Sequence, residues 1–246
     1  MNNSLVKNII FPLRVFSFFF TGFVLSIYAI YFDKTKIQEV CNILLDIAGL
    51  KKRSRLEITD KNSIVIFNHI NMFDALIMYS LFKNPPAIVA RQEYITNFPL
   101  KLFNRCLTII PVSREGKQNT TVKINEFIED SEQNLLLAPD GCNIIRQGDE
   151  IAEFKNGAFI NDKRQIIPIV IRYKSREKDT KLNWNNNNIL ELFLSILKNG
   201  DIDVFLEKLG PFTKEKTEET DEYKTRVWKA MCGKLSQLPS QYPKIC

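Results

Sequence analysis

The chain has 246 residues, of which 45% are hydrophobic and 25% are charged. This length fits one large α/β domain or two small ones, and the hydrophobic fraction excludes a chain that is disordered by composition. The net charge of +6 is spread along the sequence, with no basic helix and no aromatic-basic repeat. We therefore expect no nucleic-acid partner, and we relate the charge to anionic membrane lipids or phosphate-bearing ligands.

The cysteine and histidine counts exclude further classes of protein. The five cysteines are widely spaced and form no C-x-x-C pair, which argues against a disulfide framework and a zinc site and favours a reducing compartment. His69 is the only histidine, so zinc hydrolysis that relies on an H-E-x-x-H motif is excluded. We expect no metal and no bound cofactor.

The first element in chain order is an apolar stretch from Val15 to Phe32 that contains no charged residue. As a helix it would be roughly 27 Å long, enough for the core of a bilayer. A signal peptide is disfavoured because no small-residue cleavage site is present, and a buried core helix is the other alternative. Lysines are more frequent after the stretch than before it, which predicts a membrane anchor with the rest of the chain in the cytosol.

A second apolar run, Val40 to Leu50, is too short to span a membrane. It would lie in the membrane interface or pair with the first helix as a shallow hairpin, so a single span and a monotopic anchor both remain open. Residues 1–50 are predicted as the anchor, and a basic linker over residues 51–55 is predicted to follow it.

Strand and helix patterns alternate in the remaining chain. The predicted strands cover residues 63–67, 87–90, 107–112, 135–138, 166–173 and 203–206, and the predicted helices cover residues 72–82, 98–104, 117–130, 189–197 and 219–238. This order predicts an α/β domain over residues 51–212, with a mixed, largely parallel central sheet covered by helices. Residues 213–246 are predicted as a charged linker and a C-terminal helix that packs on the domain.

A histidine and an aspartate bracket the start of the helix after the first predicted strand. His69 and Asp74 are five positions apart, a spacing that would turn them about 140° away from each other inside one helix. They can meet only if His69 lies in the loop before the helix. Asn71 is the candidate N-cap, which would make Asp74 the third helical residue. His69 would then be a general base that Asp74 orients, and an acceptor alcohol would attack an acyl carbon.

Four sequence blocks, in order, resemble those of the glycerolipid acyltransferase family. They are Asn68-His69 with Asp74, Ile109 to Arg114 (IIPVSR), Pro139-Asp140-Gly141, and the proline-bearing strand Ile167 to Val170 (IPIV). The resemblance extends over residues 60–210 and the hydrophobic N-terminus, and it is greatest to the lysophosphatidylcholine acyltransferase-like subgroup.

The resemblance implies an activity and a location. A fatty acyl chain would pass from acyl-CoA, as co-substrate, to the hydroxyl of a lysophospholipid or a glycerol-3-phosphate-type acceptor, in phospholipid synthesis or remodelling. The location implied is a membrane, the endoplasmic reticulum, with the catalytic domain facing the cytosol and with membrane lipids as partners.

The resemblance also implies the roles of individual residues. The catalytic residues would be His69 and Asp74, and the substrate-binding residues would be Asn68, Arg114, Asp140, Gly141 and Pro168. Arg114 would grip a phosphate bidentately, and Pro168 would shape a strand near the acyl pocket. Backbone N–H groups near the histidine loop or the helix start would stabilise the oxyanion of the tetrahedral intermediate.

Two departures from the family pattern support an alternative function. Asp140 stands where the family has a glutamate. Either Cys142 stands where the family has a threonine, or the loop is one residue shorter and Asn143 replaces a later polar residue. The alternative is a non-catalytic membrane or lipid-droplet scaffold that keeps the acyltransferase fold. A hydrolase with a Ser or Cys nucleophile ranks last, because the chain has no G-x-S-x-G elbow.

Overall fold

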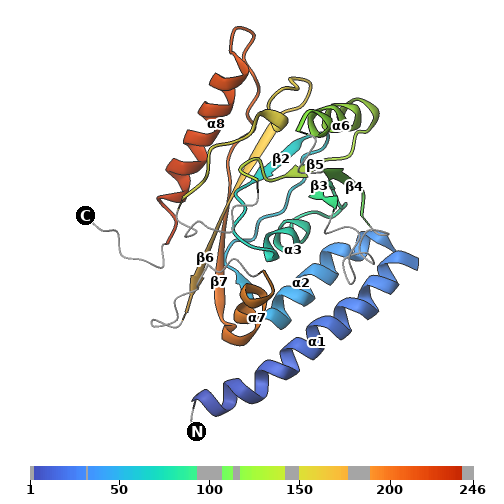
Figure 1. Ribbon diagram of the computed structural model, residues 1–246, viewed down its shortest axis with the longest axis vertical. Coiled ribbons are helices and arrows are strands. Elements are labelled where there is room, and N and C mark those ends of the chain that lie inside the picture. The colour runs from blue at the N-terminus through green and yellow to red at the C-terminus, as the bar shows by residue number, and fades with distance from the viewer. Residues whose placement is uncertain are drawn as a thin grey trace.

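A seven-stranded sheet forms the centre of the computed structural model, which describes residues 3–31, 33–92, 107–112, 117–141, 150–176 and 189–239 (Figure 1). Its strands, in spatial order, are β1 (Leu50–Lys52), β7 (Ile202–Lys208), β6 (Ile166–Ser175), β2 (Ile64–Phe67), β5 (Leu135–Leu137), β3 (Ala87–Arg91) and β4 (Ile109–Val112). Neighbouring strands run parallel except β6 and β7, which are antiparallel. The prediction of a mixed, largely parallel sheet is confirmed.

Helices cover both faces of this sheet, which is why the central strands are continuous apolar runs rather than alternating ones. One face carries α1 (Asn3–Tyr31), α2 (Ile37–Ala48), α3 (Phe73–Tyr79) and α7 (Ile189–Asn199), in the lower part of Figure 1. The other face carries α6 (Lys117–Asp130) and α8 (Thr220–Leu235). Two short 3₁₀ helices, η1 (Lys34–Lys36) and η2 (Asn156–Ala158), complete the described elements.

Most predicted elements are found within a few residues of their expected bounds, but the basic linker is wrong. Lys51 and Lys52 belong to β1, an edge strand that pairs with β7, and the N–H of Arg53 continues this ladder by donating to the carbonyl of Val204. Charged residues are common on edge strands because they discourage pairing with other chains. The two lysines of β1 therefore gave this strand the composition of a linker. The predicted helix over residues 98–104 lies outside the described residues.

The N-terminal helices are part of the same hydrophobic core as the sheet. Leu44 and Leu45 of α2 are almost fully buried in that core, and Phe18 of α1 packs edge-to-face on Phe73 of α3, with ring centroids 5.9 Å apart. The apolar segment therefore does not form a helix that is separate from the α/β domain. It lies along α2 and α7.

Two glycines allow the ends of α2 and α7 to meet beside α1. Gly49 and Gly200 follow the two helices with φ angles of 75° and 55°, and a Cβ on Gly49 would lie only 2.8 Å from the Cα of Gly200. Arg14 of α1 reaches the same point, where its Nη1 donates to the carbonyl of Leu197 at 3.5 Å. A cation at a helix C-terminus is favourable because it faces the negative end of the helix dipole.

We expect Gly49→Ala to lower the free energy of unfolding by at least about 2 kcal/mol, since the substitution adds a left-handed alanine to a backbone clash. Gly210→Ala is the matched control, because nothing lies within 4 Å of its Cβ position, and its effect should stay within about 0.5 kcal/mol. Urea unfolding of the detergent-solubilised protein, followed by circular dichroism, measures both changes. Equal stabilities of the two variants would contradict the close approach of α2 and α7.

Candidate active site

The candidate site lies at the carboxyl ends of two adjacent parallel strands. His69 follows β2 and Asp140 follows β5, and these strands pair in register from Ile64 and Leu135 onward. In open α/β sheets, ligands bind beyond the carboxyl ends of the strands, where loops can converge. The topology therefore places the histidine loop and the Asp140 loop together, although 71 positions separate them in the sequence.

His69 and Asp74 form the hydrogen-bonded pair that their spacing predicts. Nδ1 of His69 lies 2.8 Å from Oδ2 of Asp74, with His69 in the loop before α3. The predicted N-cap at Asn71 is wrong by one position: the N-cap is Met72, which makes no side-chain capping bond, and Oδ1 of Asn71 accepts from the N–H of Phe73 at 2.7 Å. The helix begins at Phe73, so Asp74 is its second residue rather than its third. The His69 side chain is 25% exposed and Asp74 is fully buried, which leaves the imidazole as the partner that a substrate can reach.

Four donors converge on the buried carboxylate of Asp74. Its Oδ2 accepts from the N–H groups of Ile70, at 2.5 Å, and Asn71, at 2.8 Å, as well as from His69. Its Oδ1 accepts from the hydroxyl of Tyr173 on β6. Hydrogen bonds to a carboxylate stabilise its charged form against the cost of burial.

Tyr173 is the residue at this site that the sequence analysis missed. Burial and the neighbouring Asp74 raise the pKa of Tyr173 well above its usual value, so its hydroxyl stays protonated. The available signal was strand alternation, which places Tyr173 on the same face of β6 as Ile169 and Ile171. Strand alternation alone could not place Tyr173 beside Asp74, because that placement also depends on the pairing of β6 with β2.

The backbone N–H groups of the histidine loop are already engaged. The N–H of His69 donates to Asp140 at 3.0 Å, and those of Ile70 and Asn71 donate to Asp74. The N–H groups of Phe73 and Asp74 both donate to Asn71. These five groups all have partners within the protein, and the role of backbone N–H groups near this loop or the helix start as oxyanion donors stays a prediction.

Asp140 ties the loop after β5 to the histidine loop. Burial raises the pKa of Asp140 to about 6, although the hydrogen bond from the His69 N–H and the nearby imidazole act in the opposite direction. Oδ2 accepts the His69 N–H, whereas Oδ1 is buried without a hydrogen-bond partner in the described part of the chain. A buried unpaired oxygen is costly, and it offers a substrate hydroxyl a place to donate.

Gly141, the next residue, adopts a φ of 58° and leaves room for a cation. A Cβ at this position would lie 2.5 Å from Nζ of Lys155, whose side chain crosses the glycine. The backbone N–H of Lys155 donates to the carbonyl of Pro139 at 2.9 Å, which fixes the lysine beside this loop. The ammonium group therefore lies next to the Asp140-Gly141 turn.

The remaining predicted site residues fall into three different places. Asn68 is buried, and its amide exchanges two hydrogen bonds with the backbone of Ile171, at 2.9 and 2.8 Å. Pro168 is buried within β6, and by alternation with Ile166 and Val170 it faces α8, away from the His69 pair. Arg114 lies outside the described residues.

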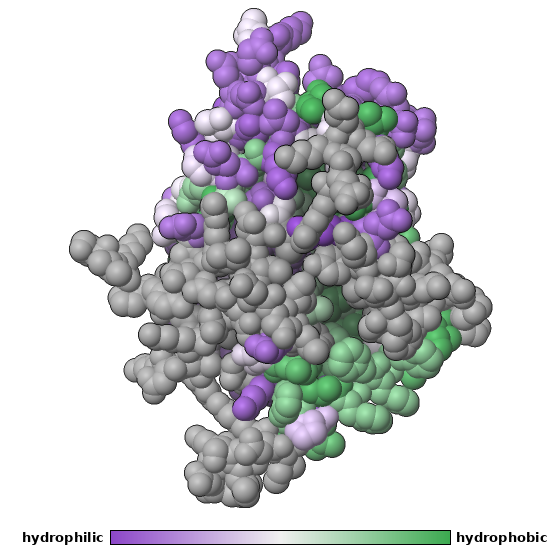
Figure 2. Space-filling model, viewed as in Figure 1, coloured by the Kyte–Doolittle hydropathy of each residue, from purple (hydrophilic) through white to green (hydrophobic). Residues whose placement is uncertain are grey.

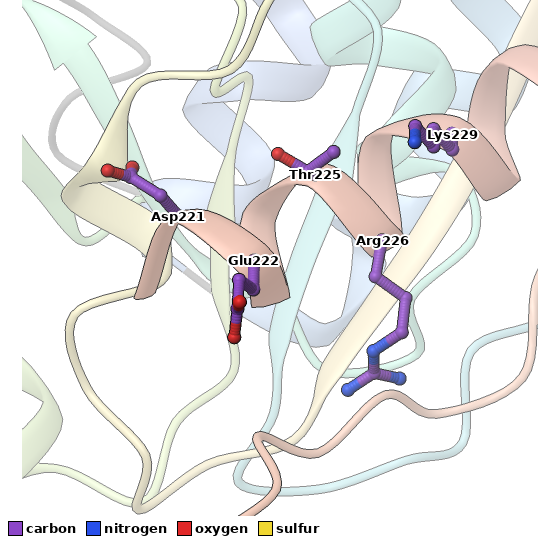
Figure 3. Close-up of a pocket in the computed structure, with 5 residues that line it drawn as sticks. All are labelled: Asp221, Glu222, Thr225, Arg226 and Lys229. Carbon is purple, nitrogen blue, oxygen red and sulfur yellow. The ribbon is translucent and has the colours of Figure 1, made fainter. Parts of the chain in front are cut away.

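A surface hollow of about 630 Å³ lies elsewhere, on the first half of α8 (Figure 3). Asp221, Glu222, Thr225, Arg226 and Lys229 line it, and the charges of both signs belong to one exposed helix. Since α8 covers the opposite face of the sheet from α3, this hollow is separate from the His69 pair. Within the described ranges, no three His, Cys, Asp or Glu side chains gather as a metal site.

Comparisons with known proteins give the family and the fold of the chain. Residues 45–172 match the family described as Acyltransferase. The crystal structure of the 1-acyl-sn-glycerophosphate (LPA) acyltransferase PlsC from Thermotoga maritima superimposes with a TM-score of 0.62 at 16% identity, covering 98% of both chains, and so shows the same fold. No curated protein sequence matches the chain significantly. Since the family match spans more than half of the sequence, including His69 and Asp74, the chain belongs to the acyltransferase family.

Proposed function

We propose that this protein is an acyl-CoA-dependent O-acyltransferase that esterifies the hydroxyl of a lysophospholipid or a related glycerol-3-phosphate-type acceptor. The observation that carries the proposal is the His69–Asp74 pair, in which a partly exposed imidazole is oriented by a fully buried carboxylate. An imidazole held in this way is suited to take a proton from an alcohol and return it later.

The proposed reaction needs no nucleophile from the protein. Nε2 of His69 removes the proton of the acceptor hydroxyl as its oxygen attacks the thioester carbonyl carbon. The tetrahedral intermediate then collapses, the carbon–sulfur bond breaks, and the leaving thiolate takes the proton from the imidazolium. Asp74 stabilises the imidazolium between these steps and holds Nδ1 protonated.

The acceptor side of the site is proposed around the Asp140-Gly141 turn. The unpaired Oδ1 of Asp140 would accept a hydrogen bond from the acceptor, and the ammonium of Lys155 would attract its phosphate. The role of Arg114 in phosphate binding stays a prediction. The solved acyltransferase of the same fold is named for 1-acyl-sn-glycerophosphate, a phosphate-bearing lysolipid, which supports this class of acceptor. Asn68, whose amide bonds both backbone groups of Ile171, is proposed to position the loop.

We further propose that α1 docks the protein on a membrane in a monotopic manner. Its residues Ile10–Ala29 are long and apolar enough to cross a bilayer, but Phe18, Gly22 and Ala29 are buried against the rest of the protein. The outer side of the helix exposes Leu13, Phe16 and Phe20 to 61%, 67% and 58%. Figure 2 shows this apolar surface along the lower right, in contrast to the polar surface over α6 and α8.

A helix with one side packed on the domain and the other exposed and apolar suits the plane of the interface. Phe18 of this helix contacts Phe73, which directly precedes Asp74 in the sequence. A protein docked through α1 would therefore hold its site near the lipid surface. We propose the cytosolic face of the endoplasmic reticulum as the location, because the odd, widely spaced cysteines fit a reducing compartment.

We expect His69→Ala to lower kcat by a factor on the order of 10³, because a positioned general base contributes about 10² to 10⁴. The assay uses acyl-CoA and a panel of lysophospholipids with purified protein in liposomes. Asp74→Asn should give a comparable loss, and Asp221→Asn, an exposed carboxylate on α8, should have no effect. Unchanged turnover in His69→Ala would refute the mechanism, and no transfer by the natural protein would favour the scaffold alternative.

Asp140→Asn should raise stability and lower activity at neutral pH. The pKa of this carboxyl is raised from 3.8 to about 6 in the folded protein, so the folded state binds the proton more tightly than the unfolded state. The natural protein therefore loses stability as pH rises from about 4 to about 6, by up to about 3 kcal/mol for two pKa units. The variant has no ionisable group at this position, so its free energy of unfolding should not show this decrease. Urea unfolding at pH 4 and pH 7 measures the free energy of unfolding of both proteins. Parallel pH dependence in both proteins would contradict the burial of this carboxyl.

Replacing Leu13, Phe16 and Phe20 together by serine should weaken binding to phospholipid vesicles by at least about 100-fold, because each apolar side chain contributes about 1–2 kcal/mol on burial. Flotation of the protein with vesicles gives the bound fraction. Val122→Ser with Ile160→Ser is the matched control, since both side chains are exposed, at 51% and 45%, but lie away from α1. Equal flotation of the two variants would place the membrane contact elsewhere.

A further inference from the structure

We propose that Tyr173 is a positioning residue of the His69–Asp74 pair, whose hydroxyl holds Oδ1 of Asp74 so that Oδ2 stays directed at Nδ1 of His69. This inference rests on the proposed function for its catalytic meaning. The hydrogen bonds that join Tyr173, Asp74 and His69 are part of the folded structure, so they can be tested without an acyl-transfer assay.

The two oxygens of Asp74 have different donors. Oδ2 accepts three hydrogen bonds, all from the loop that begins at His69. Oδ1 accepts from the Tyr173 hydroxyl, and no Lys or Arg of the described ranges pairs with Asp74. The hydroxyl is the one donor that fixes the carboxylate from the side of the sheet, and without it a fully buried oxygen would have no donor among the described residues.

The tyrosine hydroxyl has one proton, and two acceptors of the described residues near it are Oδ1 of Asn71 and Oδ1 of Asp74. Its hydroxyl oxygen lies 3.4 Å from Oδ1 of Asn71 and much closer to Oδ1 of Asp74. Oδ1 of Asn71 already accepts from the N–H of Phe73. The proton is therefore directed at the carboxylate, where a charge-assisted hydrogen bond is the stronger one.

Asn68 explains how a residue of β6 reaches the site. Strand β2 ends at Phe67, but the Asn68 amide continues the ladder by bonding both backbone groups of Ile171. Tyr173 is two residues further along β6 and so points to the same face as Ile171, towards α3. The same asparagine thus sets the start of the histidine loop and the position of the tyrosine.

This arrangement has a consequence for the charge of the pair. The titratable groups near His69 include Asp74 on α3, Asp140 after β5 and Tyr173 on β6, and the ammonium of Lys155 lies beside the Asp140-Gly141 turn. When the imidazole of His69 is neutral, it does not offset the negative charge of Asp74. The hydrogen bond from the Tyr173 hydroxyl to Asp74 is then strongest. The hydroxyl therefore favours the neutral imidazole, which is the form that acts as a base.

The test uses the fact that His69 is the only histidine in the chain. Labelling with ¹⁵N-histidine gives the ring signals of this residue alone, and their pH titration in the intact, detergent-solubilised protein reports the protonation and tautomer of the pair. In Tyr173→Phe we expect the titration midpoint to rise by about one pH unit. We also expect the neutral ring to lose its preference for the Nδ1-protonated tautomer.

Tyr79→Phe is the matched control. Tyr79 and Tyr173 are both 4% exposed, but the Tyr79 hydroxyl lies 3.5 Å from the carbonyl of Pro86, not beside Asp74. Its titration should match that of the natural protein. A natural midpoint and tautomer in folded Tyr173→Phe would overturn the proposal, because a purely structural hydroxyl would change stability only.

Two further measurements separate possible failures. If Tyr173→Phe does not fold, site-specific 3-fluorotyrosine at position 173 keeps the ring and strengthens the donor, so the midpoint should fall, and an unchanged or higher midpoint would overturn the proposal. In the acyl-transfer assay, Tyr173→Phe should lower kcat about tenfold with both KM values unchanged. If the natural protein transfers no acyl group, the proposed function fails, while the His69 titration still decides the role of Tyr173.

Discussion

One buried carboxylate organises the site. Asp74 is fully enclosed, and its two oxygens gather His69, two backbone N–H groups and the Tyr173 hydroxyl. Leaving such a charge without donors would cost several kcal/mol, so the loop before α3 must take the conformation that supplies them. That conformation fixes the imidazole, uses up the loop's own N–H groups, and directs the His69 N–H towards Asp140. The geometry of the His69–Asp74 pair and the shape of the loop are therefore consequences of the same interaction.

Much of the fold and the central pair could be predicted from the sequence, because the signals were local. Apolar runs marked the buried strands, and the five-residue spacing of His69 and Asp74 required the histidine to precede the helix. Tyr173 and the use of Asn68 could not be predicted in this way. Both depend on the pairing of β2 with β6, which brings together residues about 100 positions apart. The edge strand β1 was taken for a linker because its lysines obscure a short strand whose partner, β7, comes much later in the chain.

The apolar helix α1 and the site form one structural unit. Arg14 and the glycines that end α2 and α7 fix α1 on the domain, and Phe18 connects it to the start of α3. A lysolipid acceptor and an acyl-CoA donor are both amphipathic, so the proposed docking of α1 on a membrane would suit substrates that lie with one end in lipid. The Asp140-Gly141 turn and Lys155 are next to the same loop and offer polar groups to the headgroup end.

The central claim is that this chain transfers acyl groups through His69 to a phosphate-bearing lysolipid. The most direct measurement is a matrix of acyl-CoA donors against acceptors, with the natural protein in liposomes and the products identified by mass spectrometry. The account predicts a new ester on at least one lysophospholipid or glycerol phosphate, with release of one free thiol for each ester formed. Thiol release without any new ester, or no product with any acceptor, would contradict it.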